Sequence, residues 1–165
     1  MIPAPIPDNE DARLKALRDL LVLDTPAEER YNSIVEFAAA EFNVPMVLIS
    51  LVDNDRQWFK ASVGLDVCET SRDVAFCGHA ILTSDTMVVP DALDDLRFMD
   101  NPLVLGDPHI RFYAGAPLEL PGGEVVGTLC LLDSEPRHFE PAEMQTLGAL
   151  RSLVVDQLMT AAVLA

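Results

Sequence analysis

The stretch Ile110–Leu132, IRFYAGAPLELPGGEVVGTLCLL, contains the clearest secondary-structure signal in the chain. Its two apolar runs, Ile110–Leu120 and Val125–Leu132, flank the turn Pro121-Gly122-Gly123-Glu124. Two apolar runs of this length that meet at a Gly-Gly turn are typical of a β-hairpin. The stretch therefore predicts two adjacent antiparallel strands.

A second hairpin is expected earlier in the chain. Met46–Val52 is an apolar run too short for a helix, Asp53-Asn54-Asp55 is a turn, and Gln57–Val63 is the expected partner strand. Met87–Pro90 adds a brief strand. Because hairpins join neighbouring antiparallel strands, two of them favour an antiparallel sheet.

Helical segments precede, interrupt and follow these strands. Leucines spaced three and four apart predict a helix within residues 8–23. The capping-box pattern Thr25-Pro26-Ala27-Glu28 predicts the start of a second helix, which should end near Asn43. A short helix is expected around 76–81, a short helix or an ordered loop is expected over 94–103, and Pro141–Leu164 is a long terminal helix. This order of elements predicts an α+β fold with helices packed on the sheet.

Composition excludes several classes of protein. The chain has 165 residues, half of them hydrophobic, which is enough for one domain with a substantial core. Its 27 acidic and 11 basic side chains give a net charge of −16. This charge argues against binding to nucleic acids or anionic membranes, since both need clustered basic side chains. We expect a proline-rich arm at residues 1–11 and one domain at residues 12–165.

The three cysteines and the first residues indicate a cytoplasmic protein. Three is an odd number of cysteines in a chain large enough to fold without disulfides, which fits a reducing compartment. The first residues lack the basic start and apolar stretch of a targeting signal. No apolar run reaches the roughly 18 residues that suggest a membrane helix.

Several motifs carry a resemblance to a known family. They are RDVAFCGHAI at 72–81, VVPDA at 88–92, DLRF at 95–98, DNPLV at 100–104, IRFYAGAPL at 110–118 and GTLC at 127–130. Over residues 12–160 the chain resembles a GAF domain of the kind that precedes histidine kinases or diguanylate cyclases in bacterial sensors. The resemblance implies a six-stranded antiparallel sheet, with the first, second and last helices on one face. On the other face, short helices and loops would close a pocket.

The candidate ligand-binding residues are those that the motifs place near the expected pocket. They are Cys77, His79, Asp91, Arg97, Phe98, Asn101, Arg111 and Tyr113. We predict no catalytic residues and no metal ligands. Two residues apart in a helix means about 200° apart around its axis, so Cys77 and His79 form a poor metal pair. For His79, a structural role and a hydrogen bond to a ligand both remain open.

The charged and aromatic candidates each have two interpretations. The aspartates between 91 and 100 could hold a cation or do acid–base chemistry, but Asp also caps helix starts without any further function. Arg111 lies in an apolar run, where it would pair with one of these aspartates or hold an anionic ligand. Phe98 fits core packing as well as a pocket wall. Of Phe112 and Tyr113, only one can face the pocket, because neighbouring strand residues point to opposite faces.

The terminal helix suggests a dimer. Its apolar residues occupy more than one face of the helix: Leu147, Leu150, Leu153, Val154, Val155, Leu158 and Met159. One face can cover the sheet, and the other would pack on the first helix or on a second copy of the chain. We expect a homodimer through the N- and C-terminal helices.

No complete catalytic set is present, so the expected function is that of a non-catalytic sensor. Such a sensor binds a small ligand, here unidentified, in the pocket and signals through a helical dimer. The sequence requires no cofactor. Its expected partners are an attached output domain or a kinase or cyclase, as in two-component systems.

Two alternatives come from other members of the family. The chain resembles free methionine-R-sulfoxide reductase in its Cys77-Gly78 turn and in Cys68, nine residues earlier. The third cysteine of that enzyme would fall within residues 98–102 of this chain, where no cysteine occurs. A Cys68–Cys77 pair could still respond to redox conditions. Bilin-binding photoreceptors carry a histidine directly after the attachment cysteine, whereas here Gly78 separates Cys77 from His79.

Overall fold

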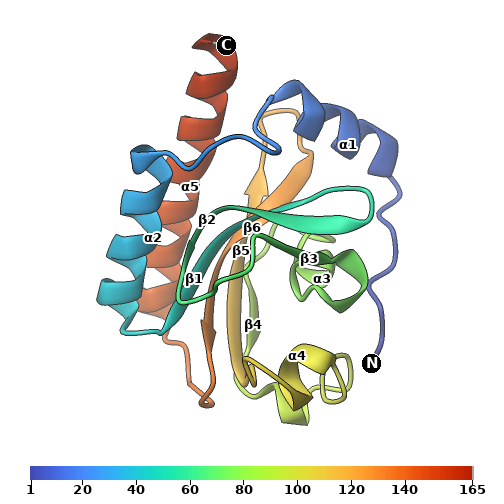
Figure 1. The fold of residues 1–165 in the computed structure, drawn as a ribbon, viewed down its shortest axis with the longest axis vertical. Helices are drawn as coiled ribbons and strands as arrows, with labels where there is room; N and C mark the ends of the chain where they lie inside the picture. Colours follow the sequence, from blue (N-terminus) through green and yellow to red (C-terminus); the bar gives the residue numbers. More distant parts are fainter. Residues whose placement is uncertain (165) are drawn as a thin grey trace.

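A six-stranded antiparallel sheet organises the computed structural model, which describes residues 1–164 (Figure 1). Its strand order is β3-β2-β1-β6-β5-β4. The strands are β1 (Met46–Val52), β2 (Arg56–Val63), β3 (Glu69–Ser71), β4 (Met87–Val89), β5 (Phe112–Glu119) and β6 (Val125–Asp133). Both predicted hairpins are confirmed, since β1 pairs with β2 and β5 pairs with β6. The short strand β3 was not predicted.

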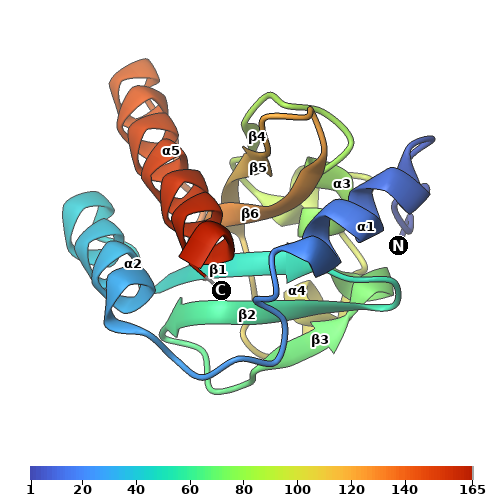
Figure 2. The same cartoon turned by 90° about the horizontal axis from the view of Figure 1, so that it is seen from above.

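Within residues 1–164, five α-helices and two 3₁₀ helices surround the sheet. They are α1 (Glu10–Asp19), α2 (Glu29–Phe42), η1 (Arg72–Val74), α3 (Cys77–Ala80), η2 (Ala92–Asp94), α4 (Pro102–Leu105) and α5 (Pro141–Leu164). Helices α2 and α5 lie side by side on one face of the sheet (Figure 2). Helix α1 lies at the end of the sheet beside β6, and Leu17 reaches the core under α2 and α5. The short helices and their loops cover the opposite face.

Neighbouring residues on a strand contribute to two separate cores. On β5, Phe112 packs on the helix-covered side against Phe139, with ring centroids 5.6 Å apart, whereas Tyr113 belongs to the core under α3 and α4. On β2, Trp58 and Phe59 divide in the same way. The prediction that only one of Phe112 and Tyr113 faces the pocket side is confirmed.

The predicted start of the second helix is wrong. Helix α2 begins at Glu29, and Thr25 lies outside it. The Thr25 hydroxyl donates to the Val22 carbonyl and accepts from Lys60 Nζ at 2.8 Å. The buried Lys60 ammonium also donates to the Pro26 carbonyl at 2.6 Å. Because these contacts hold the segment extended, the capping-box pattern is not used.

A buried ion cluster ties α1 to the rest of the fold. Arg13 is 1% exposed and donates to the Val52 carbonyl at 2.6 Å and to the Glu10 carboxylate at 2.8 and 2.9 Å. Arg72, at the start of η1, also donates to Glu10. Burial alone would raise the pKa of Glu10, but the two guanidinium groups outweigh it and lower that pKa to about 2.

Most of the apolar surface of α5 is covered by the chain itself. Leu147, Val154 and Leu158 are buried, and further apolar side chains of α5 pack partly against the same core. Leu153 remains 43% exposed. The apolar side chains of α5 therefore serve mainly the monomer core, which leaves less surface for a second copy than the sequence pattern indicates.

Candidate functional site

A cavity of about 250 Å³ lies between the sheet and the loops opposite α2 and α5. Strands β1, β2, β5 and β6 form its floor, and the segment after β2, helix α3 and the segment around α4 form its walls. Nine apolar side chains line it: Leu48, Phe59, Leu65, Val67, Phe76, Leu103, Pro108, Ile110 and Leu132. The other lining residues are Gln57, Thr70, Cys77, Asp107, Tyr113 and Cys130. The cavity thus suits an apolar molecule with few polar groups.

Two cysteines and two hydroxyl groups form a buried cluster in the cavity wall. Cys77 Sγ lies 3.0 Å from Thr128 Oγ1, 3.2 Å from the Tyr113 hydroxyl and 3.9 Å from Cys130 Sγ. All four side chains are at most 2% exposed. Cys77 begins α3, Tyr113 lies on β5, and Thr128 and Cys130 alternate on β6, so three segments of the chain build the cluster.

The hydrogen bonds of this cluster favour a thiolate on Cys77. Its neighbours Cys130, Thr128 and Tyr113 can each aim a hydrogen at the sulfur, and together they outweigh burial and lower the pKa of Cys77 to about 7. Burial raises the pKa of Cys130, and the adjacent Cys77 adds to this effect. Burial likewise raises the pKa of Tyr113, which keeps its hydroxyl protonated as a donor. The two thiols therefore differ in character, with Cys77 the more nucleophilic.

Polar groups also line the cavity on its β2 side. Ser50 Oγ donates to Gln57 Oε1 at 3.0 Å, and Gln57 Nε2 donates to Thr70 Oγ1 at 2.7 Å. This short chain of hydrogen bonds leaves each group with capacity for one more partner. It provides a place where a ligand with one hydroxyl, amide or amine group could be oriented.

Of the eight candidate pocket residues, Cys77 and Tyr113 lie on the cavity wall. The expected placement of His79 is wrong. Its Nε2 donates to the carbonyl of Ile2 at 2.8 Å, and its ring meets Phe98 edge-on with centroids 5.1 Å apart. Burial lowers the pKa of His79. The imidazole therefore fastens the N-terminal arm to α3 and does not reach the cavity.

Arg97 and Phe98 were also expected at the pocket, and both lie behind its wall. Arg97 binds the carboxylate of Asp95 through Nη2 at 2.7 Å and through Nε at 3.0 Å. Phe98 stacks on Phe76 with ring centroids 4.0 Å apart, so Phe76 separates it from the cavity. The Arg97 guanidinium is engaged in the ion pair and the Phe98 ring in the stack, so neither group is available to hold a ligand.

Asp91 and Asn101 act as helix caps, which was one of the two interpretations of the acidic stretch. Asp91 Oδ1 accepts from the Leu93 amide at 3.1 Å at the start of η2. Asn101 Oδ1 accepts from the Leu103 amide at 2.8 Å at the start of α4, and its Nδ2 donates to the Val74 carbonyl at 3.0 Å. Neither side chain lines the cavity.

Arg111 follows neither of its expected interpretations. Its Nη1 donates to the carbonyls of Val104 at 2.8 Å and Ile110 at 3.0 Å. Among the described residues no carboxylate lies within ion-pair distance of it, and it does not line the cavity. Arg111 therefore holds the end of α4 against the sheet through backbone carbonyls.

Sequence reasoning missed Thr128, Cys130 and Gln57 as members of the site. Cys130 belongs to the GTLC motif but was not among the candidate site residues, and it is fully buried in β6. The signal that could have found the cluster is the alternation Thr128-Leu129-Cys130, which places both polar side chains on the face opposite Leu129. The structure does not pair Cys68 with Cys77, since Cys68 is exposed and Cys77 is buried against Cys130.

Two kinds of feature are absent from residues 1–164. No group of three His, Cys, Asp or Glu side chains lies close enough to hold a metal ion. No helix in this range is both long and apolar enough to cross a membrane.

Comparison with known proteins adds one curated relative. A cyclic di-GMP phosphodiesterase of Pseudomonas aeruginosa is 42% identical over 164 residues. The match covers 92% of this chain but only 28% of that relative, so the chain spans less than a third of its length.

Solved structures share the fold at low sequence identity. The GAF domain of a phosphoenolpyruvate-protein phosphotransferase from Acinetobacter is 20% identical, with a TM-score of 0.67 over 93% of this chain and 96% of that one. Free methionine-R-sulfoxide reductase from Neisseria meningitidis, solved with its substrate, is 16% identical, with a TM-score of 0.68 over 100% and 99%. A family model described as GAF domain matches residues 26–158. The six-stranded sheet, the covering helices and this match together show that the chain belongs to the GAF domain family.

Proposed function

We propose that the chain is a non-catalytic sensory GAF domain that binds a small, largely apolar molecule in the cavity over its sheet. The observation that carries this proposal is the composition of the lining: nine apolar side chains and, among the described residues, no lysine or arginine. An apolar cavity of about 150 Å³ is enough to bind benzene. A cavity of about 250 Å³ therefore fits a molecule with one or two rings.

The same lining disfavours charged ligands. A cyclic nucleotide would bring phosphate charge into a wall whose one ionisable carboxylate, Asp107, repels it. Free methionine sulfoxide carries both an ammonium and a carboxylate group, and the latter would have no cationic partner in this wall. A linear tetrapyrrole is larger than the cavity and carries two propionates. These mismatches favour a neutral ligand over the substrates and chromophores of the two alternative family members.

For the output, we propose control of cyclic di-GMP turnover by an attached or associated domain. The support is the curated relative, named a cyclic di-GMP phosphodiesterase, in which the matched part is 28% of the length. A histidine kinase or diguanylate cyclase partner is the second choice, from the resemblance to bacterial sensors. Cyclic dinucleotide signalling and three free thiols both fit a cytoplasmic location.

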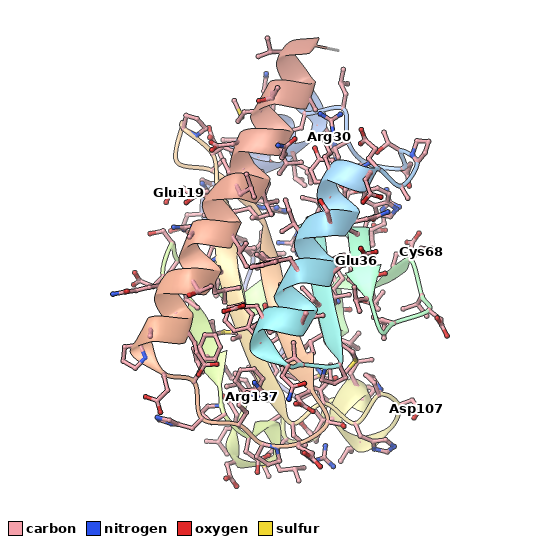
Figure 3. The ribbon with its side chains drawn as sticks, turned by 90° about the vertical axis from the view of Figure 1, so that its left-hand side faces the viewer. Arg30, Glu36, Cys68, Asp107, Glu119 and Arg137 are labelled. Atoms are coloured by element: carbon pink, nitrogen blue, oxygen red, sulfur yellow. The ribbon has the colours of Figure 1, made fainter. Side chains whose placement is uncertain are left out.

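We propose that signalling passes through a homodimer formed by the helical face. Figure 3 looks directly onto α2 and α5, with Glu36 labelled on α2. Helix α2 exposes Phe37 at 53%, and α5 exposes Met144 at 36%, Leu153 at 43% and Val163 at 81%. Exposed aromatic and aliphatic groups of this kind are common anchors of protein interfaces.

Binding of indole tests the ligand proposal, since indole is a two-ring apolar molecule with one hydrogen-bond donor. Titration calorimetry on the full chain should detect binding at a single site. Leu103→Phe, which fills the cavity, should weaken binding by at least about tenfold. The matched control is Leu105→Phe on the same helix, because Leu105 is 61% exposed and does not line the cavity.

Three results would count against the proposal. They are a lack of indole binding, an equal loss of binding in Leu103→Phe and Leu105→Phe, or native mass spectrometry of the purified chain that finds a retained anionic molecule. A retained neutral molecule of one or two rings would support it and identify the ligand directly.

A further inference from the structure

The two buried thiols have no place in the proposed ligand-binding function. Cys77 lies on α3 and Cys130 on β6, and their sulfurs are 3.9 Å apart although 53 positions separate them in the sequence. Both residues line the cavity, so a small molecule that enters it reaches both sulfurs. The third cysteine, Cys68, is exposed on the segment between β2 and β3 (Figure 3).

The distance between the sulfurs can close with a small movement. A disulfide needs a sulfur–sulfur distance of about 2.05 Å, so the two atoms must approach by about 1.9 Å. Cys130 is fixed within the central strand β6, which pairs with both β1 and β5. Cys77 starts a helix of four residues, so α3 and the Cys77 side chain are the parts that can move.

The surroundings of the pair favour reaction at Cys77. The hydroxyls of Thr128 and Tyr113 lie 3.0 and 3.2 Å from its sulfur and can donate to a thiolate. At Cys130, burial outweighs the hydrogen bonds from Thr128 and the Leu48 backbone and raises the pKa, so this residue stays a thiol. The pair therefore combines a nucleophilic thiol with a nearby neutral thiol, which is the arrangement of an attacking and a resolving cysteine.

We propose that Cys77 and Cys130 form a redox switch that hydrogen peroxide closes into a disulfide inside the cavity wall. In the first step the Cys77 thiolate attacks one peroxide oxygen, the O–O bond breaks, and hydroxide leaves as Cys77 becomes a sulfenic acid. In the second step the Cys130 sulfur attacks the sulfenic sulfur, the S–O bond breaks, and water leaves. Two thiols and one peroxide thus give one disulfide and two waters, with sulfur oxidised and oxygen reduced.

This inference stands apart from the proposed ligand. It requires only that hydrogen peroxide can enter the cavity, and it does not depend on which larger ligand the cavity binds. If both hold, the disulfide ties α3 to β6 across one side of the cavity, so oxidation and ligand binding influence each other. The Thr128 and Tyr113 hydroxyls would then lose the thiolate that they stabilise.

The test uses the full chain, reduced, freed of reductant and then treated with hydrogen peroxide. Denaturation in an alkylating reagent, followed by intact-mass and peptide analysis, counts the remaining thiols. The wild type should lose two alkylatable thiols and two hydrogens in mass, with a peptide that joins Cys77 to Cys130. The matched control Cys68→Ser should do the same.

Single variants separate the two roles. Cys130→Ser should stop at a sulfenic acid on Cys77 that dimedone traps, and Cys77→Ser should leave Cys130 alkylatable. Thermal melting checks that each variant is folded; if one is not, wild type and Cys68→Ser still decide the question. A disulfide that contains Cys68, or full alkylation of Cys77 and Cys130 after peroxide, would overturn the proposal. Indole binding to the reduced protein is scored separately, so either proposal can fail alone.

Discussion

The two faces of the sheet differ in how closely the side chains on them pack. On the helix side, two long helices press a continuous layer of fully buried aliphatic side chains onto the strands, with Leu129, Leu131, Leu147 and Val154 all at 0% exposure. On the opposite side, four-residue helices and loops surround a cavity, a stack of aromatic rings and two thiols. The close packing of the helix side supplies stability, so the other side can keep the open volume that binding requires.

The largest expected effect compares two neighbouring leucines of β6. Leu131 lies in the helix-side core at 0% exposure, and Leu132 lines the cavity. Leu131→Ala should lower the free energy of unfolding by about 4 kcal/mol, because it opens a void in close packing. Leu132→Ala should cost about 2 kcal/mol, because that side chain already borders empty space. Urea unfolding of both variants checks this, and equal costs would show that the two faces pack equally well.

The ion cluster that ties α1 to η1 should make the free energy of unfolding depend on pH. The pKa of Glu10 is lowered from its ordinary value of 4.5 to about 2, so its ionised form stabilises the fold fully above pH 4.5. This contribution disappears as the pH falls toward 2. Glu10→Gln should therefore lose about 2–3 kcal/mol at pH 7 and converge with the wild type near pH 2.

The control for this prediction is Glu36→Gln on the exposed side of α2 (Figure 3). It should leave the free energy of unfolding within about 0.5 kcal/mol of the wild type at every pH. A wild-type and Glu10→Gln difference that stays constant from pH 7 to pH 2 would contradict an ionised Glu10 as its source.

A smaller effect is expected from the cap of α4 on the cavity side. Asn101 is 2% exposed, caps α4 and donates to the Val74 carbonyl. Asn101→Ala should cost about 1–2 kcal/mol. It should also weaken indole binding, since α4 carries Leu103 into the cavity wall. The half-buried cap of η2, Asp91→Ala, is the matched control, with a cost of about 0.5–1 kcal/mol and unchanged indole affinity.

The smallest effect on stability is expected at the exposed part of the helix side. Phe37→Ser combined with Leu153→Ser should change the free energy of unfolding of the monomer by less than about 1 kcal/mol, since both side chains are largely solvated. Self-association, measured by sedimentation equilibrium, should weaken by at least about tenfold. Unchanged association would remove these two side chains from the proposed interface.

Sequence patterns predicted the elements whose signals are local. The terminal helix was predicted at Pro141–Leu164, where the structure has α5, and the first strand was predicted at Met46–Val52, where the structure has β1. The start of α2 was not predictable in this way, because Thr25 is held by Lys60, which comes from a strand 35 residues later. Strand β3 has three residues, too few for any alternation pattern to be read.

The site was harder to predict because the polar side chains of this chain bind backbone carbonyls. Arg111, His79 and Asn101 each donate to a main-chain oxygen, and such an oxygen has no sequence signature. From the sequence, only carboxylates and anionic ligands were expected as partners for Arg111. Cys130 was not predicted as a site residue for a different reason. It matters because it lies beside Cys77, and only the folded chain brings the two residues together.

The alternation of side chains along β6 has a consequence for redesign of the cavity. Thr128, Cys130 and Leu132 face the cavity side, and Leu129 and Leu131 between them face the helices. A library that randomises only Thr128, Cys130 and Leu132 leaves the closely packed layer on the helix side unchanged. New specificities could then be selected in an already stable scaffold, and drift at the same three positions offers natural lineages the same route.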